Sequence, residues 1–175
     1  METKTAQILM VLKVLAWIAF IGYLIEAGSI MISFTVSYLN PVAAKDLYKG
    51  LDFYNLRQMD FWHYTQSISL LLALSLMKAW VWWLVIKTLS SINLANPFKM
   101  EVAHILEKIG YILFSIWITA LLASAHTGWL MKRTGELFGS TDTMDEFLFM
   151  AGLVYIISQV FKRGVEIQSE NELTV

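Results

Sequence analysis

Residues 8–39 read ILMVLKVLAWIAFIGYLIEAGSIMISFTVSYL, an apolar stretch whose only charged side chains are Lys13 and Glu26. Three further apolar stretches, residues 64–89, 109–130 and 147–161, occupy most of the remaining chain. A helix crosses the hydrocarbon core of a bilayer with about 20 mainly apolar residues, because each residue rises about 1.5 Å and the core is about 30 Å thick. Each stretch is long enough, or nearly so, and the sequence therefore predicts an integral membrane protein.

The composition agrees with a membrane location. Hydrophobic residues make up 57% of the chain and charged residues 15%, and the mean hydropathy is +0.58, which is far from the balance of a soluble domain. The formal net charge of -1 leaves no basic excess for a polyanion, so we expect no direct binding of nucleic acid. Because the chain has no cysteine, disulfide exchange, thiolate catalysis and cysteine-ligated metals are excluded.

The four stretches predict an all-α, polytopic membrane protein in which four transmembrane helices form a bundle. We place these helices at about residues 6–38, 63–90, 98–131 and 144–163, within a single domain that covers residues 1–175 and ends in a cytoplasmic tail, residues 164–175. Because Lys13 interrupts the first stretch, we expect a retained helix and not a cleaved signal peptide. The loop between the first two helices is the largest and mixes charged with aromatic residues, which indicates an ordered, partly helical cap against the membrane surface.

Local signals indicate where the later helices begin and end. Asn96 is a candidate cap for the third helix, and Pro97 suits its first turn. We expect Asp142 or Thr143 to cap the fourth helix. Gly164 is expected to end that helix, because glycine is a poor helix former.

The orientation depends on lysine and arginine in the short loops, since cytoplasmic loops carry an excess of these residues. The two sides of the membrane nearly tie in this respect. We favour both termini in the cytoplasm, because several cations on that side lie directly at helix ends, whereas those of the first loop alternate with acids. The helix-end cations are Lys87, Lys108, Lys162 and Arg163.

Three segments carry a family resemblance. The residues NPF at 96–98, with Glu101, open the third helix; ILEKIG follows at residues 105–110, and the chain ends in FKRGVEIQSENELTV at residues 161–175. Together they resemble the bacterial membrane family named domain of unknown function 2975, and the ending is the most specific part. The resemblance implies a four-helix bacterial inner-membrane protein with no established activity. Because relatives are often encoded beside a small helix-turn-helix regulator, it also implies a role in signalling or regulation.

The end of the chain is a candidate binding segment. An acidic, partly apolar tail can add a strand to a cytoplasmic partner or dock into it, with main-chain hydrogen bonds giving affinity and side chains giving selection. The alternative, which we favour, is that the tail packs on the cytoplasmic face of this protein beside the turn that opens the third helix. The candidate tail residues are Glu166, Ile167, Glu170, Asn171, Leu173, Thr174 and Val175, and the turn residues are Asn96, Pro97, Phe98 and Glu101.

Charged residues at bilayer depth are costly and usually functional, which makes Lys78 and Glu26 a candidate intramembrane polar site. Lys78 lies nine residues before Lys87, roughly 13 Å inside the expected boundary by the helical rise. We favour snorkelling of its long side chain over a role in a polar path or ligand pocket. The position of Glu26 in the first helix places it near the outer interface, as a poor partner for Lys78.

Two histidines form a candidate cluster near the outer face, because His63 opens the second helix and His126 lies late in the third. Imidazole together with a carboxylate can bind a divalent ion inside a helical bundle. However, no pair of these side chains has the three- or four-residue spacing that places two ligands on one helix face. We therefore favour histidines that hydrogen-bond to water or to neighbouring groups, and predict no metal.

No enzyme signature is present: the chain lacks a Gly-rich phosphate loop, a His-Glu-x-x-His pair and a nucleophile elbow, so we predict neither an enzyme nor a cofactor. The leading hypothesis is a regulatory or sensory protein of the lipid bilayer whose cytoplasmic tail or turn binds a soluble partner, such as a small helix-turn-helix regulator. The alternatives are a small transporter or oligomeric pore, and a structural or assembly subunit of a membrane complex. The oligomeric state stays open.

Overall fold

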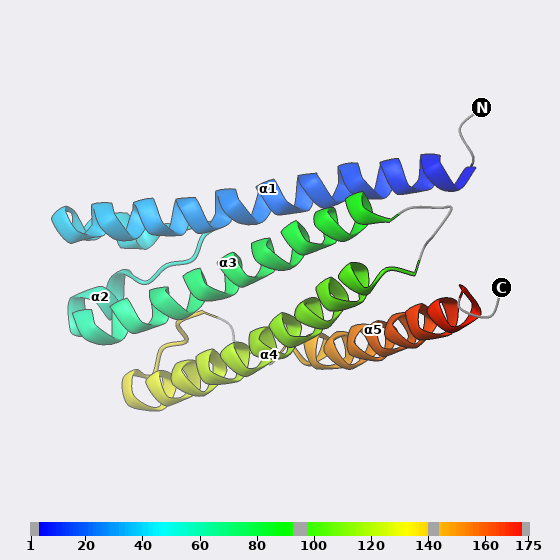
Figure 1. Cartoon of the computed structure of the whole chain (residues 1–175). Coiled ribbons are helices and arrows are strands. Elements are labelled where there is room, and N and C mark those ends of the chain that lie inside the picture. Colours follow the sequence, from blue (N-terminus) through cyan, green and yellow to red (C-terminus); the bar gives the residue numbers. More distant parts are fainter. Residues whose placement is uncertain (1–3, 93–97, 140–143, 173–175) are drawn as a thin grey trace. The chain divides into compact units, whose positions relative to one another are not determined.

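The computed structural model describes residues 4–92, 98–139 and 144–172, with side chains described as far as Glu170. Its elements are helices: α1 (Lys4–Leu39), the short 3-10 helix η1 (Pro41–Lys45), α2 (Tyr54–Met59), α3 (Phe61–Ser91), α4 (Met100–Thr134) and α5 (Asp145–Glu172) (Figure 1). No strand occurs in these three ranges. The prediction of an all-α protein is confirmed.

Four of these helices, α1, α3, α4 and α5, are long and apolar enough to cross a membrane. They contain 36, 31, 35 and 28 residues, which is more than the about 20 that a hydrocarbon core requires. The predicted set of four spanning helices is therefore confirmed. The short helices η1 and α2 lie in the loop between α1 and α3, as the composition of that loop indicates.

The prediction that Gly164 ends the last helix is wrong, because α5 continues through it to Glu172. A helical glycine costs only about 1 kcal/mol relative to alanine, and local contacts favour the longer helix. Arg163 Nη1 donates to Glu166 Oε2 at 2.7 Å, an i, i+3 pair across the helical turn that contains Gly164. The expected caps Asn96, Pro97, Asp142 and Thr143 lie outside the described residues.

The chain divides into two compact units. Unit 1 contains Met1–Phe20, Trp80–Ser115 and Asp145–Val175, and unit 2 contains Ile21–Ala79 and Ile116–Met144. Helices α1, α3 and α4 each contribute a segment to both units, whereas η1 and α2 belong to unit 2 and α5 belongs to unit 1. The single domain expected from the sequence stays a prediction.

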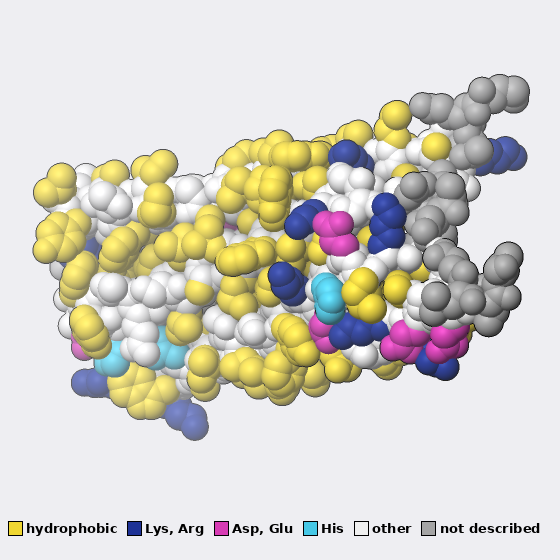
Figure 2. Space-filling model, in the orientation of Figure 1, with side chains coloured by type: hydrophobic (Ala, Val, Ile, Leu, Met, Phe, Trp, Pro, Cys, Tyr) yellow, Lys and Arg dark blue, Asp and Glu magenta, His cyan; other side chains and the backbone are white. Residues whose placement is uncertain are grey.

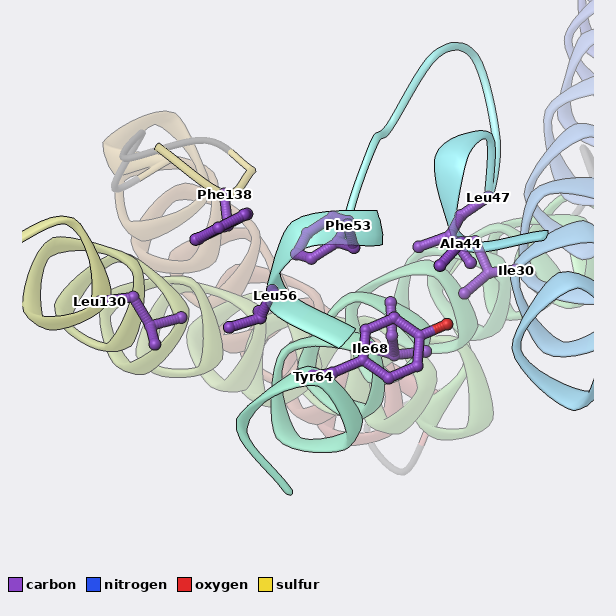
Figure 3. Close-up of a cluster of buried hydrophobic side chains, with 9 residues drawn as sticks. All are labelled: Ile30, Ala44, Leu47, Phe53, Leu56, Tyr64, Ile68, Leu130 and Phe138. Atoms are coloured by element: carbon purple, nitrogen blue, oxygen red, sulfur yellow. The ribbon is translucent and has the colours of Figure 1, made fainter. Parts of the chain in front are cut away.

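Unit 2 contains a hydrophobic core built around the loop between α1 and α3 (Figure 3). Leu47, Phe53 and Leu56 of this loop are each only 1% exposed, and they pack with apolar side chains from α1, α3, α4 and the segment after α4. The remaining members of the core are Ile30, Ala44, Tyr64, Ile68, Leu130 and Phe138. Burial on this scale orders the loop, and the prediction of an ordered, partly helical cap is confirmed in that respect.

A polar network joins this loop to the end of α1. The last carbonyl groups of a helix lack partners within the helix, and here Arg57 Nε donates to the Ser37 carbonyl oxygen at 2.8 Å. The hydroxyl groups of Ser37 and Tyr64 hydrogen-bond to each other at 2.8 Å in a buried position. These bonds fix the C-terminal end of α1 against α2 and the first turns of α3.

Candidate functional site

The intramembrane polar site predicted from Lys78 and Glu26 lies where α1 meets α3 in unit 2. Ser75 Oγ donates to Glu26 Oε1 at 2.6 Å. The Lys78 Nζ atom lies 5.8 Å from the centre of the Tyr23 ring, within the range of a cation–π contact. Glu26 and Lys78 are both half-buried.

These contacts place the two charged residues at one interface between α1 and α3. Tyr23 and Glu26 are one helical turn apart on α1, and their partners Ser75 and Lys78 are one turn apart on α3, so both contacts belong to the same helix–helix interface. Glu26 and Lys78 therefore lie on successive turns of one interface, and the expectation that they are poor partners stays a prediction. The sequence proposed the two charged groups, but it did not indicate Ser75 and Tyr23, which provide the contacts.

The two histidines of the candidate outer cluster do converge, in unit 2. The ring centroids of His63 and His126 are 5.6 Å apart, and Trp129 lies against both rings, with centroids at 4.8 and 6.3 Å. The His63 Nε2 atom is 3.7 Å from Asp60 Oδ2. Within the described ranges no group of three or more histidine, aspartate or glutamate side chains has an arrangement that holds a metal ion.

A small cavity of about 30 Å³ lies beside these rings, lined among others by Ser67, His126 and Thr127. Three buried polar atoms of unit 2, Ser67 Oγ, His63 Nδ1 and His126 Nε2, have no hydrogen-bond partner among the described protein atoms. A cavity of this size holds one water molecule. His126 and Ser67 line the cavity, and hydration of the histidines stays a prediction.

In unit 1, charged side chains gather where α3 ends, α4 begins and α5 ends; we call this region the charged end. Figure 2 shows lysine, arginine, acidic and histidine side chains near the C-terminal part of α5 and the start of α4. Lys162 Nζ donates to Glu107 Oε1 at 2.8 Å, and His104 Nδ1 lies 3.6 Å from the other oxygen of Glu107. Lys87 and Glu101 form a longer, exposed pair at 4.0 Å, which adds little stability.

Phe98, from the turn predicted before α4, packs on the last part of α5. Its ring centroid is 5.5 Å from that of Phe161. A Cβ atom built on Gly164 would lie 2.5 Å from Phe98 Cδ1, so only glycine admits the ring at this position. Phe98 of the turn and Gly164 at the start of the tail therefore lie side by side, whereas Glu166, Ile167 and Glu170 are exposed. Packing of the whole tail on this protein stays a prediction. The remaining tail and turn candidates lie outside the described part. They are the side chain of Asn171 and residues Leu173, Thr174, Val175, Asn96 and Pro97.

Sequence reasoning missed an apolar groove between α4 and α5 in unit 1, with a volume of about 300 Å³. We call it the tyrosine groove; its lining residues are Gly110, Tyr111, Phe114, Leu148, Ala151, Gly152 and Tyr155. Spacings of three, four and seven residues place Tyr111 with Phe114, and Leu148 with Tyr155, on one face of each helix. That periodicity was readable in the sequence, but the pairing of these two faces was not.

The described residues form four long apolar helices and no strand, which is the fold of a multi-pass helical membrane protein. The chain belongs to the family described as "Protein of unknown function (DUF2975)", which matches residues 58–175. The resemblance read from the sequence is thus confirmed, and the match takes in α3, α4 and α5. No curated protein and no solved structure matches this chain.

Proposed function

We propose that this chain is a regulatory or sensory protein of the bacterial inner membrane, with both termini in the cytoplasm, and that the end of α5 binds a soluble partner. The observation that carries the proposal is that α5 continues as a charged helix beyond its apolar part. Its 28 residues extend about 42 Å, against a hydrocarbon core of about 30 Å. The final turns thus have the length to project from the bilayer, and no catalytic step is assigned to them.

The exposed face of these turns suits recognition as a helix. Arg163 and Ile167 are four residues apart, and so are Glu166 and Glu170, so the four side chains lie on neighbouring rows of α5. Ile167 is 47% exposed, and it provides an apolar anchor between acidic side chains. Helical segments bind partner grooves through such anchors. This replaces the strand addition that the sequence suggested for the tail.

The chemistry of this face favours a basic partner. Residues 164–175 contain three glutamates, Glu166, Glu170 and Glu172, and no lysine or arginine, so the segment is acidic. A small helix-turn-helix regulator, as the family resemblance implies, carries a basic surface for the phosphates of DNA. Complementary charge of this kind accelerates association and selects the partner.

Co-purification of the full-length protein in mild detergent with a helix-turn-helix regulator of the kind that the family resemblance implies tests the proposal. We expect Ile167→Asp and the double variant Glu166→Lys/Glu170→Lys to retain at least about tenfold less regulator than the wild type, because anchors and charge pairs dominate such interfaces. Glu136→Lys, a charge reversal at an exposed site of unit 2, is the matched control and should retain the regulator. Unchanged association after deletion of residues 164–175 would refute the proposal.

A second candidate, a small transporter or oligomeric pore, is supported by the contacts of Glu26 and Lys78 with Ser75 and Tyr23. Ionisable groups in spanning helices commonly line ion or substrate paths. This candidate requires ion or solute flux through the reconstituted wild-type protein. Proteoliposomes that hold their gradients as well as protein-free vesicles would speak against it.

A further inference from the structure

The tyrosine groove runs from an apolar part to a polar end. Phe114 and Leu148 line the apolar part, and almost all of the exposed lining is apolar. The rings of Tyr111 and Tyr155 lie with centroids 6.0 Å apart. One to two turns further along the same helices, Lys162 and Glu107 form their ion pair. The order along α4 and α5 is therefore apolar groove, tyrosine pair and charged pair.

Two glycines shape the groove, each in a different way. At Gly110 a Cβ atom would lie 3.4 Å from the Ala151 carbonyl oxygen and from Tyr155, so this glycine allows the backbones of α4 and α5 to approach closely. At Gly152 a Cβ atom would meet nothing within 4 Å. Gly110 therefore closes the floor of the groove, and Gly152 leaves it open to the surroundings of the helices.

We propose that the tyrosine groove binds one acyl chain of a membrane phospholipid, with the headgroup beyond the tyrosine pair, at the level of the ion pair of Lys162 and Glu107. The groove belongs to two helices that are apolar enough to span a bilayer, which supplies acyl chains at high local concentration. The deep part of the groove has an apolar lining that suits an acyl chain, and the tyrosine pair and the charged pair beyond it give a headgroup polar surroundings. This inference does not depend on the partner proposed for the end of α5.

The size of the groove fits an acyl chain. The groove has a volume of about 300 Å³, which leaves room for a run of acyl methylene groups. That corresponds to the upper part of a phospholipid acyl chain. Tight contact of these methylenes with Phe114, Leu148 and the exposed backbone at Gly152 would hold the chain through dispersion.

A helix from a second copy fits less well at this place. Close packing of spanning helices uses small residues repeated at every fourth position. On α5 the row through Gly152 contains Leu148, Ile156 and Val160, which are 40%, 61% and 60% exposed. Large side chains thus flank a single glycine, and they would keep the backbone of a partner helix away while leaving room for a narrower chain.

Photo-crosslinking of the full-length protein tests the proposal. The protein is reconstituted in phosphatidylethanolamine–phosphatidylglycerol vesicles that contain a phospholipid with a photoreactive group on its acyl chain, and labelled peptides are identified by mass spectrometry. We expect labelling at the groove residues that saturates with added unlabelled phospholipid. Gly152→Trp, which fills the groove, should lower this labelling by about tenfold, as expected for loss of a specific contact site.

Gly22→Trp is the matched control, because Gly22 is also a glycine of a spanning helix with open space around a Cβ atom; it should leave groove labelling unchanged. Gly152→Val provides a smaller step if the tryptophan variant does not fold, and it should give an intermediate loss. Labelling spread evenly over the apolar helices and insensitive to both Gly152 variants would overturn the proposal. So would cross-links between two copies through the groove that disappear in Gly152→Val.

Discussion

At the scale of single residues, Asp60 determines where α2 ends and α3 begins. Its backbone N–H donates to the Leu56 carbonyl oxygen at 2.8 Å, which closes the last turn of α2. Its side-chain Oδ1 accepts from the N–H groups of Trp62 and His63 at 2.9 and 3.2 Å, in the manner of a helix N-cap. One aspartate thus satisfies amide groups that the start of α3 would leave without partners.

The same contacts make this cap sensitive to acid. The hydrogen bond from the His63 N–H, followed by that from Trp62 and by the charges of His63 and Arg133, holds the pKa of Asp60 below its ordinary value, although partial burial opposes the shift. The folded state therefore favours the carboxylate. Its contribution to stability is complete at neutral pH and is lost as the pH falls below the ordinary aspartate pKa and through the lowered one.

We predict that Asp60→Ala lowers the thermal unfolding midpoint at neutral pH by about 2–4 °C, the usual effect of losing a cap in a chain of this size. Asp60→Asn keeps an acceptor oxygen, so its unfolding midpoint should stay close to that of the wild type at neutral pH. The part of the acid-induced fall in the midpoint that comes from protonation of Asp60 should be absent from this variant. Thermal unfolding in detergent between neutral and acidic pH measures both effects. An Asp60→Asn variant with the same acid dependence as the wild type would contradict the assignment.

At the scale of elements, the sequence predicted what one helix determines alone. The four apolar stretches and the C-terminal ends of α1, α3 and α4 could be predicted, to within a few residues, from hydropathy and turn-forming residues. Both signals depend only on neighbouring positions in the chain. The partners across helices did not follow. The contacts of Glu107 with Lys162 and of Tyr111 with Tyr155 depend on the rotation and register of α4 against α5, and no local pattern encodes these. The continuation of α5 through Gly164 was missed although the pair of Arg163 and Glu166 that favours it is local. What no local pattern shows is the Phe98 ring, which occupies the space beside that glycine.

Because the Phe98 ring lies beside Gly164, the effect of an alanine at position 164 on stability should change sign when Phe98 is removed. In the wild-type background, Gly164→Ala should destabilise the protein or leave it unimproved, because the new Cβ atom displaces the Phe98 ring from Phe161. In the Phe98→Ala background the space is free, and Gly164→Ala should stabilise by up to about 1 kcal/mol through helix propensity. Unfolding of the four proteins in one detergent gives the coupling energy directly. Equal effects of alanine in both backgrounds would show that the ring does not constrain this position.

At the scale of the whole molecule, the sidedness of the membrane decides which surfaces meet which partners. Four helices are long and apolar enough to cross a membrane, and four crossings would place both termini on one side. The cations at helix ends favour the cytoplasm for that side, but the margin is six lysine and arginine residues against five. The six are Lys4, Lys87, Lys99, Lys108, Lys162 and Arg163, and the five are Lys45, Lys49, Arg57, Lys132 and Arg133. A binding role of the α5 end toward a soluble regulator requires this orientation.

The absence of cysteine from the sequence makes the orientation directly measurable, since a single introduced thiol is the only reactive one. We predict that a membrane-impermeant maleimide labels Gln58→Cys and Lys132→Cys in intact spheroplasts, whereas Ser169→Cys, on the exposed face near the end of α5, reacts only after the membrane is permeabilised. The cysteine-free wild type controls for background labelling. Labelling of Ser169→Cys in intact spheroplasts, together with no labelling of Gln58→Cys, would show the opposite topology. It would then place the charged end away from any cytoplasmic regulator, because the helix that carries Ile167 and Glu170 would project on the opposite side.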